Sequence, residues 1–191
     1  MEPPTDEALV SATLEGDPDS FRELVERYQN RLVSYLYRRL RNLDEAQEVA
    51  QEVFLKIYQA LDRFDPKYRF STWIFRVAQN AAIDLMRKRR LKLVPLTRQD
   101  DEDDETRDWD LPSPERDAYG DLRNVERGEA IQEAIEDLPE EYRELIVLRH
   151  FGDLSYDEIA TSQEMPLGTV KNKLFRGRQM LKETLRDYLT D

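Results

Sequence analysis

Apolar residues recur at steps of three and four along most of this 191-residue chain, and this spacing is the feature that most limits its fold. Side chains at such steps share one face of an α-helix, whereas a half-buried strand would alternate at steps of two. Three stripes of this kind fill the N-terminal part: Phe21, Leu24, Val25, Tyr28, Leu32, Tyr35, Leu36 and Leu40; Ala46, Val49, Ala50, Val53, Phe54, Ile57 and Leu61; Trp73, Ile74, Val77, Ala78, Ala81 and Leu85. The sequence therefore predicts an all-α fold.

Short polar segments mark the predicted helix ends. Gly16-Asp17-Pro18 predicts a helix stop, then a cap and a proline in the first turn of the next helix. Asp44 with Gln47 resembles a capping pair for the second stripe. A loop from Asp62 to Arg69 separates the second and third stripes.

One acidic segment divides the chain. Residues 100–117 hold ten acidic residues and two arginines, and they account for −8 of the total net charge of −12. The segment has no apolar periodicity and contains Pro112 and Pro114, so we expect an extended, flexible linker. The predicted organisation is two small helical domains, residues 1–94 and 121–191, joined by an acidic linker over residues 95–120.

The second part ends in a pattern typical of a helix-turn-helix. Ile131, Ile135 and Leu138 form a first apolar stripe, which Pro139 ends. A second stripe runs to Gly152 and consists of Tyr142, Leu145, Ile146, Leu148 and Phe151. Ser155 to Glu158 is a capping box for a short helix, and Pro166-Leu167-Gly168-Thr169-Val170 opens a basic one.

Two basic blocks flank the linker, although the chain as a whole is acidic. Residues 87–92 carry five positive charges and no acid, and residues 171–182 carry another five with no acid. A solvated helix surface explains a lone basic run, but the second block follows the helix-turn-helix pattern. The net charge alone would argue against nucleic-acid binding, and its distribution removes that objection.

Composition excludes several other classes. The chain has no cysteine and one histidine, so thiolate metal sites, disulfides and histidine-rich metal clusters are excluded. It has no apolar run near the ~18 residues of a membrane span, and its acidic N-terminus is unlike a signal peptide, so we expect a cytoplasmic protein with no membrane insertion. We expect no cofactor and no metal.

Two motifs in order resemble the extracytoplasmic-function (ECF), sigma-E-like group of bacterial RNA polymerase sigma factors. Residues 44–61, DEAQEVAQEVFLKIYQAL, and 69–90, RFSTWIFRVAQNAAIDLMRKRR, resemble the sigma-2 domain. Residues 137–160, DLPEEYRELIVLRHFGDLSYDEIA, and 166–182, PLGTVKNKLFRGRQMLK, resemble the helix-turn-helix sigma-4 domain. The resemblance implies a factor that binds core RNA polymerase and starts transcription at specific promoters.

The resemblance also implies sites. The −35 promoter element would be read as duplex by Gly168, Thr169, Lys171, Asn172, Phe175, Arg176 and Arg178. The −10 element would be opened and contacted by Phe64, Tyr68, Phe70, Arg76, Asn80, Asp84, Arg87 and Lys88. Trp73 lies on the inward stripe, where core packing is its expected role. The clamp of the polymerase largest subunit would bind Glu48, Gln51, Glu52 and Lys56, with Phe54 packing inward.

Further partners implied by the resemblance are the flap of the second-largest polymerase subunit, promoter DNA and an anti-sigma factor. The acidic linker is either a mimic of nucleic-acid charge in the polymerase cleft or a spacer that needs only length. The chain departs from the family at Ser162-Gln163-Glu164, where the family usually has two small or apolar residues and a turn glycine. This departure is expected to weaken packing of the first helix of the motif and to alter the turn.

Two other classes compete with this interpretation. A free-standing helix-turn-helix regulator would have a sensor or dimerisation domain in place of residues 44–90. An enzyme would need a reactive constellation, and the sequence has no phosphate-binding glycine loop, nucleophile elbow or metal-ligand spacing. His150 is expected to be a structural or solvent-facing residue, and the chain is expected not to be an enzyme.

Overall fold

Every regular element in residues 3–92 and 128–186, which the computed structural model describes, is helical. This confirms the all-α prediction for those ranges. Residues 3–92, the N-terminal half, contain α1 (Asp6–Leu14), α2 (Pro18–Leu40), α3 (Leu43–Gln59), a 3-10 turn (Leu61–Arg63) and α4 (Phe70–Lys92). Residues 128–186, the C-terminal half, contain a helix over residues 128–136, α6 (Glu140–His150), α7 (Tyr156–Ser162) and α8 (Leu167–Thr184). The predicted acidic linker and both of its boundaries lie outside the described residues.

The first helix junction forms as predicted. Gly16 has a φ of +102°, a left-handed conformation that glycine adopts without a steric penalty. The Asp17 carboxylate accepts a hydrogen bond from the backbone N–H of Asp19, and Pro18 occupies the first turn of α2. These residues therefore end α1 and begin α2 within a few positions.

The predicted cap of the second stripe's helix was wrong. The N-cap of α3 is Asn42, whose side-chain oxygen accepts from the N–H of Glu45, and Asp44 lies inside the first turn. Asn42 can cap because it precedes the helix in an extended conformation, which Asp44 does not. α4 begins at Phe70, so Ser71 is a helical residue whose side chain is free for another contact.

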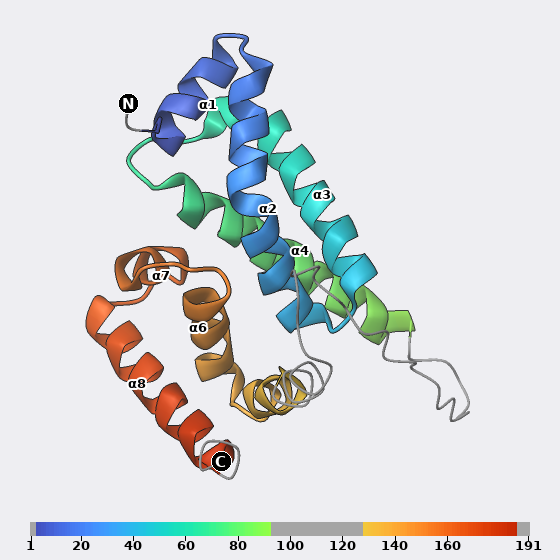
Figure 1. The fold of residues 1–191 in the computed structure, drawn as a ribbon, viewed down its shortest axis with the longest axis vertical. Helices are drawn as coiled ribbons and strands as arrows, with labels where there is room; N and C mark the ends of the chain where they lie inside the picture. Colours follow the sequence, from blue (N-terminus) through green and yellow to red (C-terminus); the bar gives the residue numbers. More distant parts are fainter. Residues whose placement is uncertain (1–2, 93–127, 187–191) are drawn as a thin grey trace, which may run out of the picture.

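The core of the N-terminal half lies between α2, α3 and α4, which run side by side (Figure 1). The predicted stripes supply its buried side chains, among them Leu24, Leu36, Val53, Ile57 and Ile74. Each fully buried aliphatic side chain of this size stabilises the fold by about 1.5–3 kcal/mol. The helical spacing in the sequence is thus the direct cause of this three-helix packing.

In the C-terminal half, α6 packs against α8 through a close crossing. A Cβ atom at Gly177 would lie 3.1 Å from Cγ1 of Ile146, so the absent side chain is what lets the two helices approach. The predicted position of Ile131 in the core was wrong, because it is 40% exposed and the neighbouring Ala130 and Ala134 are buried instead.

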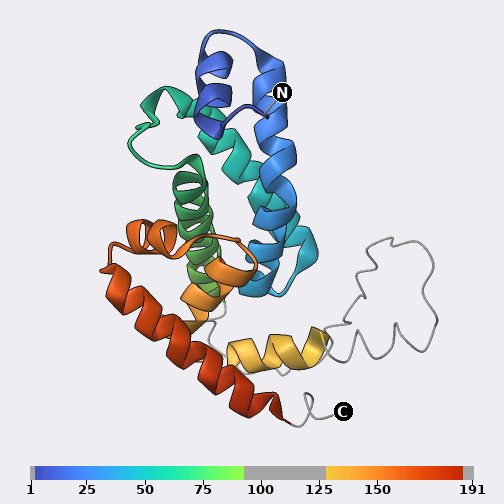
Figure 2. The ribbon, with the colours of Figure 1, turned by 60° about the vertical axis from the view of Figure 1, so that its left-hand side comes forward.

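The two halves pack against each other, which the sequence did not predict. α7 contacts α4 and α6 contacts α2, and Figure 2 shows α7 lying against α4. Gly152 sits at this junction, since a Cβ there would lie 3.1 Å from the Phe75 ring and 2.7 Å from the Leu148 carbonyl oxygen. Close approach of the α6–α7 turn to α4 therefore requires glycine at this position.

Candidate nucleic-acid interface

The basic helix α8 presents one buried face and one exposed face. Val170, Leu174 and Gly177 lie on the buried face, which packs against the other helices of the C-terminal half. The remaining positions carry the predicted −35 residues: Gly168, Lys171, Asn172, Phe175, Arg176 and Arg178 are exposed, and Thr169 is half-buried. The structure thus brings these seven residues together on the outward side of one helix.

The helix that precedes α8, α7, starts at a capping box. The Ser155 hydroxyl accepts from the Glu158 N–H at 3.3 Å, and the Glu158 carboxylate accepts from the Ser155 N–H at 2.8 Å. α8 then begins after Pro166, with its first-turn N–H groups at the exposed end. Its N-terminus and cationic face can therefore both face a phosphate backbone.

A pocket of about 410 Å³ lies where the loop before α4 meets that helix. Its lining residues are Arg63, Phe64, Asp65, Tyr68, Thr72, Trp73, Arg76, Thr161 and Glu164. The Asp65 side chain and carbonyl oxygen accept from the N–H groups of Lys67 and Tyr68, both at 3.0 Å, and this turn shapes the loop. Tyr68 is 52% exposed, so its ring is available to a ligand.

Three aromatic rings support this pocket. Phe64 lies 5.4 Å from Trp73 and 5.9 Å from Phe70 between ring centroids. Trp73 is half-buried, so it both packs against the core and lines the pocket, whereas the sequence assigned it to packing. Phe70 is fully buried against Tyr28 and the other two rings. The predicted contact of Phe70 with DNA stays a prediction, and in this structure the ring packs in the core with no exposed face.

The exposed side of α4 continues from the pocket toward the end of the helix. The predicted −10 residues Arg76, Asn80, Asp84, Arg87 and Lys88 are all exposed, at steps of three and four. Arg89, which the sequence grouped with the basic block, is instead held by Glu45 of α3 and the Leu40 carbonyl oxygen. The side chains of residues 90–92 lie outside the part that the structure describes.

The outward face of α3 carries the predicted polymerase-binding residues. Glu48, Gln51, Glu52 and Lys56 are exposed, and the Lys56 ammonium lies 3.8 Å from the Glu52 carboxylate. The sequence analysis missed two apolar residues on the exposed part of this helix, Leu55 and Tyr58, which are 57% and 54% exposed. The sequence could have indicated them, because neither residue belongs to the inward-facing apolar stripe of this helix.

A buried ionic cluster joins the two halves, and the sequence analysis missed it. The Tyr35 hydroxyl donates to Glu144 at 2.7 Å, and the Arg39 guanidinium lies 3.1 Å from Glu144 and 2.7 Å from Glu140. Burial raises the pKa of Glu144, although the charge of Arg39 and the Tyr35 hydroxyl act in the opposite direction. Burial, followed by the charge of Glu144, also raises the pKa of Tyr35 well above its usual value.

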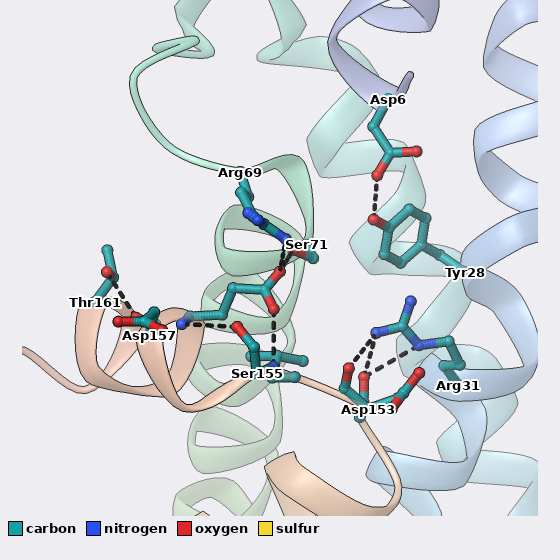
Figure 3. A network of polar contacts seen from close by, with 12 residues as sticks. Asp6, Tyr28, Arg31, Arg69, Ser71, Asp153, Ser155, Asp157 and Thr161 are labelled. Atoms are coloured by element: carbon teal, nitrogen blue, oxygen red, sulfur yellow. Dashed lines mark hydrogen bonds and ion pairs between the residues drawn. The ribbon is translucent and has the colours of Figure 1, made fainter. Parts of the chain in front are cut away.

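A second polar network crosses between the halves near the start of α4 (Figure 3). Arg31 donates to the carbonyl oxygens of Gly152 and Asp153, and the Ser71 hydroxyl donates to Glu158. Burial alone would raise the pKa of Glu158, but the Ser155 and Ser71 hydrogen bonds and the Arg69 charge hold it below its usual value. Glu158 therefore remains a carboxylate that both caps α7 and contacts α4.

The described residues form no cluster of potential metal ligands. Within residues 3–92 and 128–186 no three His, Asp or Glu side chains gather as a potential metal site. His150 lies at the exposed end of α6, and burial together with the charges of Arg178 and Arg149 lowers its pKa. No described helix is long and apolar enough to cross a membrane.

Comparison with protein families finds two matches in the order that the motifs predict. The family "Sigma-70 region 2" matches residues 24–92, and "Sigma-70, region 4" matches residues 128–181. The first match ends with α4, and the second begins with the helix over residues 128–136. The two halves of the structure therefore correspond to these two regions.

Relatives of similar length are known. The chain is 38% identical to the ECF RNA polymerase sigma factor SigW of Bacillus subtilis (strain 168) over 93% of this chain and 95% of SigW. It is 35% identical to the RNA polymerase sigma-H factor of Pseudomonas aeruginosa, over 97% of this chain and 96% of the other. The ECF sigma-E factor of Haemophilus influenzae is 33% identical over 95% of this chain and 96% of its own.

Solved structures share the fold. CnrH, solved in complex with the cytosolic domain of CnrY, matches with a TM-score of 0.68 at 24% identity over 95% of this chain and 97% of CnrH. The sigma factor RpoE of Bartonella quintana, solved with the anti-sigma factor NepR, matches with a TM-score of 0.63 at 20% identity over 87% of this chain and 96% of RpoE.

Proposed function

Because the chain belongs to the ECF group of RNA polymerase sigma factors, we propose that its two halves divide promoter recognition between them. As a member of this group, it directs promoter-specific transcription initiation. The observation that carries the division is the separation of two exposed surfaces, the outward face of α8 and the pocket with the adjoining face of α4.

In this proposal α8 reads the −35 element as duplex DNA. Asn172 and Arg176 are one helical turn apart and exposed, and amide and guanidinium groups form paired hydrogen bonds with base edges in the major groove. Lys171 and Arg178 add positive charge at the flanks, and the N-terminus of α8 faces a phosphate. The Phe175 ring, 56% exposed, offers an apolar contact for a thymine methyl group.

The pocket before α4 receives an unpaired base of the −10 element. Tyr68, Phe64 and Trp73 supply aromatic surface, and stacking on such rings contributes about 1–3 kcal/mol per base. A base turned out of the helix can be held in a pocket lined by such side chains. The exposed α4 residues Arg76, Asn80, Asp84, Arg87 and Lys88 then follow the adjoining strand by contacts with its backbone and base edges.

Core RNA polymerase is the proposed protein partner of α3. Glu48, Gln51, Glu52 and Lys56 form an exposed polar surface for the clamp of the largest subunit, and Leu55 and Tyr58 add exposed apolar area. Interfaces commonly combine such apolar contacts with a polar rim. The C-terminal half would meet the flap of the second-largest subunit.

An anti-sigma factor is a further proposed partner. CnrH and the Bartonella RpoE were each solved in complex with a second protein, and both share this chain's fold. We infer that the chain is a binding factor and not an enzyme, and that it acts in the cytoplasm, where it meets polymerase. For the acidic linker we keep two alternative roles: a mimic of nucleic-acid charge, or a spacer that needs only length.

Footprinting with and without core polymerase tests this function against that of a free-standing regulator. A sigma factor protects promoter DNA tightly only when core polymerase is added, and the protected region then spans both elements. Tight protection by the chain alone, unchanged by polymerase, would contradict the proposal and favour a regulator. The family matches already disfavour a regulator, because they cover the N-terminal half as well as the helix-turn-helix.

A further inference from the structure

Lys173 differs from the other cations of the basic block at residues 171–182. Its ammonium lies 2.6 Å from the carboxylate of Glu141, which is in the first turn of α6. Lys173 is half-buried, whereas the other four cations of the block are exposed, and within residues 3–92 and 128–186 none of those four forms an ion pair with an acid. The charge of Lys173 is therefore neutralised inside the C-terminal half, and this residue is also absent from the predicted −35 set.

The packing of α6 on α8 places Glu141 beside Arg176 as well. A Cβ atom at Gly177 would lie 3.4 Å from Cβ of Tyr142, so the first turn of α6 meets α8 directly after Arg176. The hydrogen bond from Lys173 and its charge lower the pKa of Glu141, and the charge of Arg176 lowers this pKa further. Glu141 is thus a carboxylate at neutral pH that acts on two cations of α8.

Contacts with phosphates and contacts with bases have different effects on DNA binding. A lysine that reaches a phosphate strengthens binding to every sequence, whereas a paired contact with a base edge favours one sequence. A carboxylate at the edge of a DNA-binding face pairs with such a lysine and repels nearby phosphates. Glu141 therefore lowers the part of the affinity that carries no sequence information.

Glu141 has a second effect, on the side chain that is proposed above to contact a base. An arginine side chain has many rotamers, and ordering it on binding costs free energy. The attraction of Glu141 favours those rotamers of Arg176 that keep the guanidinium near the start of α6. Fewer rotamers are then lost when Arg176 contacts DNA, and this gain occurs only where a matching base pair is present.

We propose that Glu141 is a positioning residue that increases the sequence selectivity of α8: it keeps Lys173 from the phosphates and restricts Arg176 for base contact. This inference rests on the −35 function proposed above. The competing explanation is an ordinary ion pair that only supports the packing of α6 on α8. That explanation predicts no change in DNA selectivity when the pair is removed.

The salt dependence of DNA binding by the polymerase-bound factor tests the effect on Lys173. The probes are a promoter fragment at which the chain starts transcription in vitro and the same fragment with a scrambled −35 element, both kept in the closed duplex form. In Glu141→Gln the freed Lys173 neutralises one more phosphate, so the plot of log affinity against log salt should become steeper by about 0.9. Lys173→Gln alone should keep the parent slope, and the double variant Glu141→Gln/Lys173→Gln should return to it.

The ratio of the two affinities tests the effect on selectivity. At 0.1 M salt, Glu141→Gln should bind the scrambled fragment about 2- to 8-fold more tightly, as one added phosphate contact implies. The gain on the promoter fragment should be smaller, because Arg176 loses its restriction, so the ratio should fall at least about twofold. The parent slope and parent ratio in Glu141→Gln would overturn the proposal in favour of the packing explanation. A steep slope that persists in the double variant would overturn it too, since the freed charge would then not be that of Lys173.

The matched control is Glu133→Gln, which removes one negative charge from an exposed position on the helix over residues 128–136. It should keep the parent slope and ratio, and a change equal to that of Glu141→Gln would assign the effect to net charge and contradict the proposal. Failure of the proposed function has a different result, because the parent itself would then bind both fragments equally. A selective parent with an unaltered Glu141→Gln variant leaves the function intact and overturns this inference alone.

Discussion

Arg176 is a residue at which the proposed function has a direct chemical consequence. It is exposed on α8, one helical turn after Asn172, and its guanidinium can form two hydrogen bonds with a guanine edge. We predict that Arg176→Ala weakens binding to −35 DNA by about 1–3 kcal/mol, or roughly 5- to 150-fold, and relaxes specificity at one base pair. The measurement is a competition assay on the polymerase-bound factor.

The matched control is Gln179→Ala, an exposed position on the same helix outside the predicted contact set. Gln179→Ala should keep the affinity for −35 DNA within about twofold of the wild-type value. If Arg176→Ala lowers affinity equally for all sequences, the side chain contacts phosphate and not a base. If Arg176→Ala binds −35 DNA with wild-type affinity, Arg176 makes no energetically important contact with that DNA.

Glu144 makes folding stability depend on pH in a definite direction. Its pKa is raised in the folded chain, so its contribution is fully present below about pH 4.5 and is lost as the pH rises through the folded pKa. We predict that the parent loses stability relative to Glu144→Gln as the pH rises from 4 to 7, measured as the difference in their free energies of unfolding. Urea unfolding at several pH values measures this difference; a constant difference, or one of opposite slope, would contradict it.

At the scale of elements, the crossing of α6 and α8 depends on Gly177. A Cβ there would meet Ile146, which is 1% exposed and has little room to move. Overpacking of this kind costs about 1–3 kcal/mol, which exceeds the ~0.5–1 kcal/mol gained from alanine in a helix. We predict that Gly177→Ala lowers the free energy of unfolding by about 1 kcal/mol.

Gly168→Ala is the control for this change. It lies on the same helix, and a Cβ there has no atom within 4 Å, so stability should stay equal or rise slightly. Urea unfolding midpoints compare the two variants. If the two variants are equally stable, α6 and α8 move apart to admit the added methyl group at no cost. That result would contradict the close crossing.

The exposed face of α3 predicts a charge-sensitive polymerase contact. Glu52→Lys reverses the charge of a side chain that is 65% exposed, so it should leave folding intact and reduce affinity for core polymerase at least about tenfold. Glu26→Lys makes the same change on the exposed side of α2 and serves as the control. Equal retention of both variants on immobilised core polymerase would count against the α3 assignment.

The helices themselves were predictable, because each is encoded by local spacing. Gly16, Asp17 and Pro18 set one boundary, and the Ser155–Glu158 capping box set another, through contacts between residues at most four positions apart. The start of α3 was misplaced because Asn42 and Asp44 are both good capping residues, and only backbone conformation distinguishes them.

At the scale of the whole molecule, the packing of the two halves could not be predicted from periodicity. Tyr35 lies on the apolar stripe, and nothing local indicates that its hydroxyl contacts Glu144, 109 positions away. The departure at Gln163 and Glu164 was visible in the sequence, but its expected effect was weaker packing of the first helix of the motif and an altered turn. The structure instead gives these residues partners on α4.

The most direct test of the central claim is transcription in vitro from a library of genomic fragments with bacterial core polymerase. We predict discrete start sites that require the chain and that share one element near −10 and another near −35. Arg176→Ala should change the ranking of these sites according to the −35 sequence. Start sites that are the same with and without the chain, while the chain alone protects their DNA, would contradict the assignment.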